Sequence, residues 1–332
     1  MAKNFYTKNL CAGYKSKTKE YAVVKKGDLT FNPGELVCLI GPNGSGKSTL
    51  LKTLAGLIPP LRGSVYLGGK NIQELSAKER SRQLALVLTS FPRVHGMTGW
   101  QSVALGRSPH TGWLGSLKEA DEQQIRQALQ ITGCEKLAHR FVDSMSDGER
   151  QRLAIARALA QEAEIILLDE PTAFLDLPHR VQLFVFLRKL AREQKRTVVL
   201  SIHDLELALR FADNLVVIDQ GFLHSNLPEE LVLNGTMQKV FSKDEVQFDV
   251  QTGSFKVDEK KLRPISCVGE GLAQYWTQRA LERHGWVLRE GVFPRIEVQM
   301  RASNVLWKMS LNQDQESEFV SLKELLHNLQ EF

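Results

Sequence analysis

Short apolar runs alternate with amphipathic helical patterns through the first two thirds of the chain. The runs that read as buried strands are Val37–Ile40, Leu84–Leu88, Ile165–Leu168, Val198–Ser201 and Leu215–Ile218. The patterns that read as helices are Ser48–Ala55, Asp121–Thr132, Gly148–Ala160, His179–Gln194 and Leu205–Phe211. This alternation predicts an α/β fold whose helices connect the strands of a sheet. Because residues 95–160 hold two helical patterns and no clear strand, we expect a helical insertion there.

The pattern changes near Phe241. The last part of the chain reads as a helix, two strands and a final helix over Gly271–His284, Arg295–Met300, Val305–Leu311 and Leu322–Leu329. It also contains three of the five tryptophans of the chain, whereas flexible linkers are poor in aromatic residues. We therefore predict a first domain over 1–240, with its helical subdomain at about 95–160, and a small accessory α+β domain over 241–332.

Size and charge agree with this division and exclude some partners. A chain of 332 residues has room for about two domains. The 43 Lys and Arg residues against 38 Asp and Glu residues leave a net charge of only +5. Since no basic stripe concentrates that excess, we expect no nucleic-acid partner.

Targeting signals and cysteine spacing point to the cytoplasm. The longest apolar runs are far shorter than the roughly 20 residues of a membrane-spanning helix. The first residues, Met-Ala-Lys-Asn-Phe, lack the apolar core of a signal peptide, so we expect no secretion. The four cysteines are scattered without a C-x-x-C pair, which argues against a zinc site or a disulfide framework.

A glycine-rich loop, Gly41-Pro42-Asn43-Gly44-Ser45-Gly46-Lys47-Ser48-Thr49, lies between an expected strand and an expected helix. This is the G-x-x-x-x-G-K-S pattern in the structural context that it requires. Glycines let the backbone bend around a phosphate with its N–H groups pointing inward, and the helix N-terminus adds partial positive charge. We expect Lys47 to reach the β- and γ-phosphates of a nucleotide and the Ser48 hydroxyl to ligate magnesium.

Two acids and a histidine follow other expected strands. Asp169 and Glu170 come directly after Ile165–Leu168, and His203 follows Val198–Ser201. Ligands of such sheets collect at the carboxyl ends of the strands. We expect Asp169 to hold magnesium, Glu170 to act as general base toward a water, and His203 to reach the γ-phosphate.

Together with Ser144-Met145-Ser146-Asp147-Gly148-Glu149-Arg150-Gln151, these motifs resemble the ATP-binding subunit of ABC transporters, over about residues 4–235. The resemblance implies a P-loop ATPase cassette, with a mixed sheet and a helical insertion, that binds ATP and Mg²⁺. The segments that the resemblance assigns are Tyr14 for adenine stacking, Gly41–Thr49 as Walker A, Met145–Glu149 as signature, Asp169–Glu170 as Walker B, Phe174-Leu175-Asp176 as D-loop and His203 as switch histidine.

In this family the signature serves the nucleotide of a partner chain. Ser146, Asp147, Gly148 and Glu149 are therefore expected at the γ-phosphate that a second copy holds on its own Walker A loop. One Walker A loop and one signature per chain imply that two copies enclose two ATP molecules.

Two positions depart from the family pattern. The signature usually reads L-S-G-G-Q, and here it reads M-S-D-G-E. The added charges of Asp147 and Glu149 either point away from the phosphate or weaken closure on ATP. Thr89 stands where the family has a glutamine that senses magnesium and couples to the membrane subunit.

The segment Met97–His110 resembles the M-T-V-x-E-x-V-x-x-G-R-x-P-H stretch of importers for ferric siderophores, haem and cobalamin. The resemblance implies membrane permease subunits as partners, a substrate-binding protein as an indirect partner, and a position on the cytoplasmic face of the inner membrane. The apolar and aromatic residues expected in a docking groove for the permease are Phe91, Val94, Met97 and Trp100.

Two other classes of protein remain open. One is an ABC-type ATPase that works without a membrane, although the coiled-coil or zinc insertions and the second cassette typical of that class are missing. The other is a regulatory module with a degenerate nucleotide site. Intact Lys47, Asp169, Glu170 and His203 argue against degeneracy, whereas Asp147 and Thr89 argue mildly for it.

Overall fold

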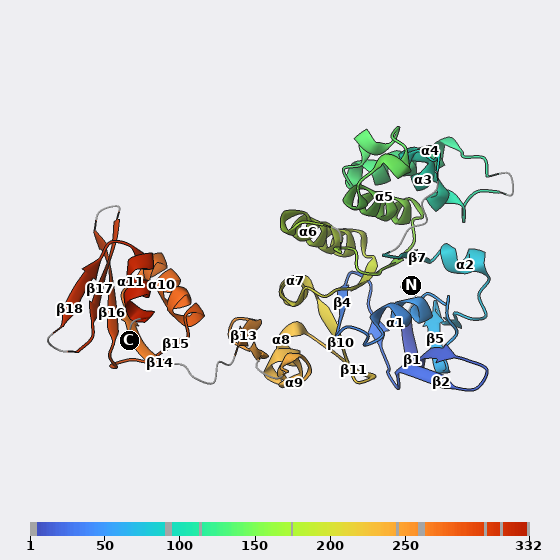
Figure 1. The fold of residues 1–332 in the computed structure, drawn as a ribbon. Coiled ribbons are helices and arrows are strands. Elements are labelled where there is room, and N and C mark those ends of the chain that lie inside the picture. Colours follow the sequence, from blue (N-terminus) through green and yellow to red (C-terminus); the bar gives the residue numbers. More distant parts are fainter. Residues whose placement is uncertain are drawn as a thin grey trace. The chain divides into compact units, whose positions relative to one another are not determined.

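The computed structural model describes residues 5–89, 95–112, 115–173, 175–243, 246–257, 263–301, 304–312 and 315–330. The chain divides into two compact units, Met1–Lys256 and Val257–Phe332. Figure 1 shows the elements of each unit along the chain.

The first unit is organised around a mostly parallel sheet. Its strands, from one edge to the other, are β11 (Phe222–Asn226), β10 (Asn214–Asp219), β4 (Leu36–Ile40), β9 (Thr197–Ser201), β8 (Ile165–Leu168) and β7 (Leu84–Val87). Neighbours from β10 to β7 pair in parallel, and β11 pairs antiparallel with β10. The predicted α/β fold is confirmed, with strand bounds that differ by one residue at most.

Both faces of this sheet are buried, which explains why its strands are continuous apolar runs. In β4 the side chains of Leu36, Cys38 and Ile40 belong to one hydrophobic cluster. Val37 and Leu39, which point to the opposite face, belong to a second cluster. A strand of alternating apolar and polar residues would place its polar side chains in one of these two hydrophobic clusters.

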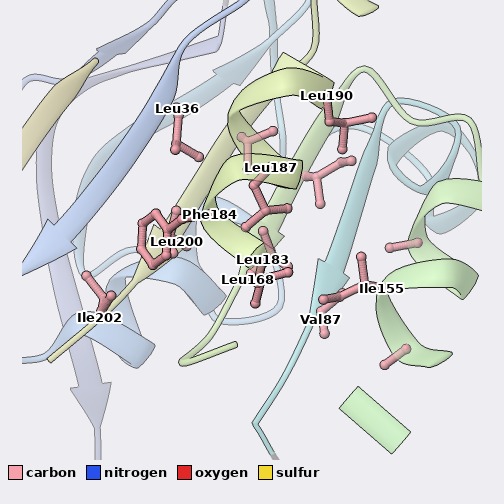
Figure 2. Packing of buried hydrophobic residues seen from close by; sticks show 14 of the residues in the cluster. Leu36, Val87, Ile155, Leu168, Leu183, Phe184, Leu187, Leu190, Leu200 and Ile202 are labelled. Atoms are coloured by element: carbon pink, nitrogen blue, oxygen red, sulfur yellow. The ribbon is translucent and has the colours of Figure 1, made fainter. Parts of the chain in front are cut away.

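Helix α6 (Leu177–Gln194) packs on the first face of the sheet. Leu183, Phe184, Leu187 and Leu190 recur at helical spacing and are all buried. Figure 2 shows them near side chains of β4, β8 and β9, with Val87 of β7 beside Ile155 of α5. Helices α5 (Asp147–Ala160) and α7 (Leu205–Phe211) add buried residues to the same cluster.

A second, antiparallel sheet contributes to the cluster on the opposite face of the central sheet. Its strands are β1 (Phe5–Lys15), β2 (Glu20–Val24), β3 (Thr30–Phe31), β5 (Arg62–Leu67) and β6 (Lys70–Asn71). The hydrophobic pattern did not predict this sheet, because its strands mix buried and exposed positions irregularly. Helix α1 (Lys47–Leu54) contributes Leu50, Leu51 and Leu54 to this cluster, and α2 (Ala77–Ser81) precedes β7.

The predicted helical insertion is present. Its elements are α3 (Gly99–Ala104), the 3₁₀ turns Leu105–Arg107, Glu135–Leu137 and Val142–Ser144, and the helices α4 (Glu119–Ile131) and α5. In Figure 1 the helices α3, α4 and α5 lie together at one end of the first unit. The two expected helical patterns correspond to α4 and α5. The short α3 is an addition that begins at the capping box of Thr98 and Gln101.

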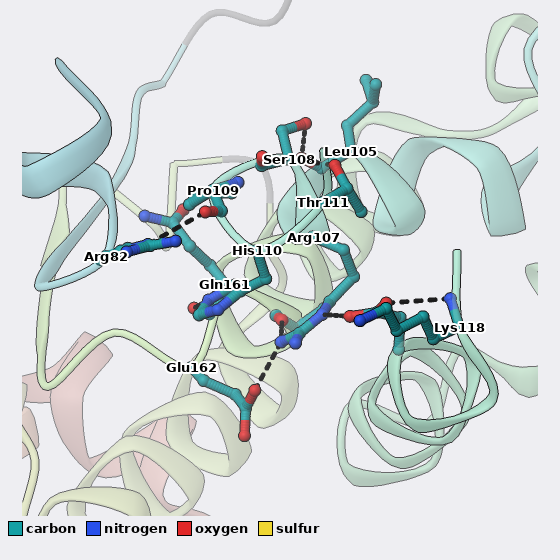
Figure 3. A network of polar contacts seen from close by, with 12 residues as sticks. Arg82, Leu105, Arg107, Ser108, Pro109, His110, Thr111, Lys118, Gln161 and Glu162 are labelled. Atoms are coloured by element: carbon teal, nitrogen blue, oxygen red, sulfur yellow. Dashed lines mark hydrogen bonds and ion pairs between the residues drawn. The ribbon is translucent and has the colours of Figure 1, made fainter. Parts of the chain in front are cut away.

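A buried arginine connects the parts of this insertion (Figure 3). Arg107 Nε donates to Asp121 Oδ1 at the start of α4 (2.9 Å). Its Nη1 donates to the carbonyl oxygen of Ala160 and to Glu162 Oε2 at the end of α5, both at 2.6 Å. The N–H of Lys118 and then Arg107 lower the pKa of Asp121. The ionised Asp121 therefore stabilises the fold at neutral pH, and this contribution is lost as the pH falls through the folded-state pKa of Asp121.

The rest of the first unit consists of α8 (Pro228–Leu233), α9 (Thr236–Phe241) and the paired strands β12 (Val246–Asp249) and β13 (Ser254–Val257). The second unit has its own hydrophobic cluster. Its elements are β14 (Arg263–Val268), α10 (Gly271–Arg283), β15 (Trp286–Leu288), β16 (Arg295–Arg301), β17 (Asn304–Ser310), β18 (Glu316–Phe319) and α11 (Leu322–Gln330), with the sheet order β15-β14-β16-β17-β18. Across the described parts of both units, every helix is too short or too polar to cross a membrane.

Replacing the buried arginine tests the energetics of the insertion. We expect Arg107→Ala to lower the free energy of unfolding of the full chain by about 3 kcal/mol, because it leaves the buried carboxylate of Asp121 without its cationic partner. The exposed pair of Lys189 and Glu193 provides the control, and Lys189→Ala should cost less than about 0.5 kcal/mol. Urea denaturation followed by circular dichroism measures both. Equal losses for the two variants would contradict a structural role of the buried ion pair.

Candidate active site

The loop between β4 and α1 has the backbone that a phosphate cradle needs. Gly46, the N-cap of α1, has a φ of 99°, which side-chain-bearing residues rarely adopt. A Cβ atom at this position would lie 2.8 Å from side-chain atoms of Val23. Gly41 has a φ of 154°, and a Cβ atom there would lie 2.8 Å from Ser45 Oγ. Glycine is therefore required at both ends of the loop.

Lys47 is held inside the curve of this loop. Its Nζ donates to the carbonyl oxygens of Gly41 (2.8 Å) and Pro42 (3.2 Å). Burial lowers the pKa of the Lys47 ammonium, while the carboxylates of Glu170 and Asp169 oppose that shift. Ser45 Oγ is buried and finds no hydrogen-bond partner among the described residues. A buried cation and an unpaired hydroxyl in a glycine loop fit an anionic ligand.

Asp169 connects three elements at the edge of the sheet. The Ser48 hydroxyl at the start of α1 donates to Asp169 Oδ1 (2.9 Å), as does the Ser201 hydroxyl at the end of β9 (2.7 Å). Ser48 and Asp169 thus present neighbouring hydroxyl and carboxylate oxygens, which are the ligand types that Mg²⁺ prefers.

Glu170 and His203 form a pair beside these oxygens. His203 Nε2 lies 2.7 Å from Glu170 Oε1, with the side chains 47% and 29% exposed respectively. Glu170 adopts a φ of 47°, in the left-handed region that is costly for a residue with a side chain. Because both side chains are partly exposed, the pair of Glu170 and His203 is accessible to a substrate and to water.

These groups open onto one cavity of about 440 Å³. Its lining consists of Val23, Asn43, Gly44, Gly46, Lys47, Ser48, Thr49, Glu170 and His203. Tyr14, which is 47% exposed, hydrogen-bonds through its hydroxyl to Thr49 Oγ1 (3.0 Å), so the residue expected to stack on adenine is tied to the same loop.

The signature residues lie at the start of α5. The Ser146 hydroxyl accepts from the N–H of Glu149, whose Oε2 accepts from the N–H of Ser146 (2.8 Å) in a capping box. Glu149 Oε1 accepts from Arg140 Nη1 (2.7 Å). Asp147 pairs with Arg150. Both added negative charges thus have arginine partners within the chain.

A second cavity, of about 490 Å³, joins the signature to the D-loop. Its lining consists of Ser146, Asp147, Gly148, Glu149, Arg152, Leu175, Asp176 and His179. Asp176 also caps α6 by accepting from the N–H of His179 (3.2 Å). Phe174, the first residue of the expected D-loop, lies outside the described residues. The two cavities have no lining residue in common.

Thr89, in the place of the expected glutamine, lies just beyond β7. Its hydroxyl donates to the carbonyl oxygen of Asp169 (2.9 Å). Ser201 and Val23 are two further residues at the site that sequence reasoning missed. A polar residue at the end of the apolar run Val198–Ser201 signals Ser201, whereas Val23 has no sequence signal.

Family comparisons agree with this geometry. Residues 24–173 match the ABC transporter family, and residues 262–330 match the iron ABC transporter C-terminal domain. An uncharacterized ABC transporter ATP-binding protein of Methanocaldococcus jannaschii is 40% identical to this chain, over 77% of this chain and 88% of its own length. The chain belongs to the ATP-binding proteins of ABC transporters. This ABC ATPase binds ATP and hydrolyses it in coupling to transport.

The names of two other relatives of the ABC ATPase state what each of them imports. An iron(3+)-hydroxamate import ATP-binding protein of Bacillus subtilis is 36% identical over 74% of this chain and 91% of its own length. A cobalamin import ATP-binding protein of Halobacterium salinarum is 41% identical over 69% of this chain and 57% of its own length.

A solved structure supports the predicted cassette fold of the ABC ATPase. It is a dimeric ATP-binding cassette in a post-hydrolysis state, bound to ADP and Pi. The likeness has a TM-score of 0.61 and 29% sequence identity, over 68% of this chain and 98% of the other.

Proposed function

We propose that this ABC ATPase powers the import of an iron complex of the ferric-siderophore type through a membrane permease. A substrate-binding protein would deliver the complex to that permease. The observation that carries the choice of cargo is the match of residues 262–330 to the iron ABC transporter C-terminal domain. The resemblance of Met97–His110 to importers of ferric siderophores, haem and cobalamin supports it.

The chemistry of the site supports specific roles in ATP hydrolysis. Lys47 neutralises phosphate charge from inside the loop. Glu170 orients and deprotonates the attacking water, and His203, 2.7 Å from its carboxylate, holds that carboxylate in place and stabilises charge at the γ-phosphate. Tyr14 stacks on the adenine.

Ser48 and Asp169 fit the magnesium ion that such a reaction uses. Mg²⁺ in nucleotide sites takes few protein ligands, and its other ligands are phosphates and waters. Ser48 Oγ and Asp169 Oδ1, which lie 2.9 Å apart, provide two such protein ligands. When bound, the ion supplies positive charge to the phosphates of ATP.

We propose further that two copies of the chain enclose two ATP molecules. Within one chain the Walker A and signature residues line separate cavities, of about 440 and 490 Å³. Ser146 does not line the cavity of its own chain's Walker A loop, and a second copy would bring its Ser146 to the γ-phosphate held there. The dimeric state of the solved ATP-binding cassette supports this arrangement.

The negative charges of the signature are compatible with this sandwich. Arg140 balances Glu149 and Arg150 balances Asp147, so the added repulsion toward a partner's γ-phosphate is small. Hydrogen bonds from the N–H of Ser146 and from Arg140 also lower the pKa of Glu149. Its carboxylate therefore stays ionised and paired at physiological pH.

We assign the permease docking surface to the helical insertion. A cavity of about 720 Å³ lies there, lined by Thr98, Trp100, Gln101, Arg126, Leu129, Gln130, Glu135, Ala138 and His139. Trp100 is half-buried and lies 5.9 Å from Arg126 in a cation–π contact. Phe91 and Val94, which were expected in the same groove, lie outside the described residues.

Docking on a permease places the ABC ATPase at the cytoplasmic face of the inner membrane. The chain is also proposed to divide its roles between an ATP-binding domain and an accessory C-terminal domain, which the sequence pattern separates at 240/241 and the compact units of the structure at 256/257. The separate family matches at 24–173 and 262–330 support it.

Substitution of the general base tests the ATPase chemistry. We expect Glu170→Gln to lower the ATP turnover of the full chain by about 100-fold or more, because the amide cannot accept the proton of the water. Glu164→Gln, at the opposite end of β8, should leave turnover unchanged. Phosphate release at saturating ATP and Mg²⁺ measures both. An inactive wild-type chain would instead indicate a degenerate regulatory module.

Cargo uptake tests the proposed import function. A strain that lacks this chain should lose uptake of radiolabelled ferric siderophore and regain it with the wild-type chain, but not with Glu170→Gln. Haem and cobalamin uptake, measured in the same strain, should remain unchanged. Loss of either of these with normal siderophore uptake would contradict the proposed cargo.

A further inference from the structure

A single peptide group, the one between Asp169 and Glu170, is held by hydroxyl groups at the ends of the two strands that flank β8. Its carbonyl oxygen accepts from Thr89 Oγ1 beyond β7 (2.9 Å). Its N–H donates to Ser201 Oγ at the end of β9 (2.9 Å). Both polar atoms of this peptide are thus bonded to side chains at the end of the sheet, and the plane of the peptide is fixed from both sides.

The orientation of this peptide decides where the Glu170 side chain points. Glu170 has a φ of 47°, a left-handed conformation that is unfavourable for a residue with a Cβ atom. Such a conformation persists only where surrounding contacts hold it. With the peptide held by both hydroxyls, the Glu170 carboxylate lies 2.7 Å from His203 Nε2 and lines the nucleotide cavity.

We propose that Thr89 and Ser201 form a hydroxyl clamp that positions the general base. This proposal rests on the proposed role of Glu170. Thr89 acts only through the backbone of Asp169, since the Thr89 contact with the site goes to a main-chain oxygen. It occupies the position where the family has a glutamine, but the chemistry is different, because a short hydroxyl here orients the peptide that carries the base.

Thr89 is the better of the two residues to test. Ser201 is fully buried and also donates to Asp169 Oδ1, so its removal would disturb the proposed magnesium ligand as well. Within the described parts of the chain, Thr89 hydrogen-bonds to neither Lys47 nor Ser48, the residues proposed to bind phosphate and metal. Loss of the Thr89 hydroxyl should therefore slow hydrolysis and leave ATP binding unchanged.

The test compares Thr89→Val, which removes the hydroxyl at nearly constant volume, with Thr89→Ser, which keeps it. We expect Thr89→Val to lower kcat for ATP about five- to tenfold, the effect of one net hydrogen bond, with KM for ATP changed less than twofold. Thr89→Ser should retain at least about half of the wild-type kcat. A merely structural role would not be rescued by serine and would not separate kcat from KM.

Thr132→Val is the matched control. Thr132 is also partly buried and donates to a backbone carbonyl, that of Ala128, at 2.9 Å, but it lies at the end of α4. Its substitution should leave kcat unchanged. Melting temperatures of all variants, measured on the full chain, show whether each folds. A tenfold loss in Thr132→Val as well would overturn the clamp.

A double variant separates the clamp from the proposed function. If the clamp acts through Glu170, Thr89→Val should have no further effect on the residual turnover of Glu170→Gln. A further tenfold loss in the double variant would overturn the clamp but not the role of Glu170. Full turnover in Glu170→Gln alone would refute the general base. A fully active Thr89→Val with an inactive Glu170→Gln would refute the clamp alone.

Discussion

Burial of the central sheet on both faces is the constraint on which the site depends. Apolar side chains cover both sides of β4, β8 and β9 and stabilise them in the middle of the sheet. Because these strands pair in parallel, their carboxyl ends meet at one edge. The glycine loop, the two acids and the histidine each follow one of these strands. Residues far apart in sequence are thereby brought within hydrogen-bond distance.

The same edge shows how a polar network can be built on an apolar core. Asp169 accepts from Ser48 and Ser201, and the backbone of Asp169 and Glu170 is held by Thr89 and Ser201. Each of these bonds satisfies a polar group at the end of a buried strand, where an unpaired group is costly. Stability and preorganisation for ATP hydrolysis therefore come from the same contacts.

Much of this arrangement was predictable from the sequence. The runs Leu36–Ile40 and Ile165–Leu168 are buried on both faces, so their hydrophobic pattern is unambiguous, and the chemistry of the motifs that follow them is specific. The antiparallel sheet that begins at β1 was not predictable, because its burial depends on contacts with β3 and β5, far along the chain.

Contacts between distant residues account for the other omissions. The sequence shows that Glu149 adds charge to the signature, but not that Arg140, on the preceding loop, neutralises it. It shows a threonine in place of glutamine at Thr89, but not that the hydroxyl reaches the carbonyl oxygen of Asp169. Phe248, beyond the predicted domain boundary, is buried in the core of the first unit.

The central claim is that each chain completes the ATP site of another copy. The most direct test is the mass in solution of the full-length Glu170→Gln chain at saturating ATP and Mg²⁺, measured by sedimentation equilibrium. The account predicts twice the chain mass of 37.4 kDa with ATP and the mass of one chain with ADP. A single-chain mass with ATP, at protein concentrations where the wild-type chain hydrolyses ATP, would contradict it.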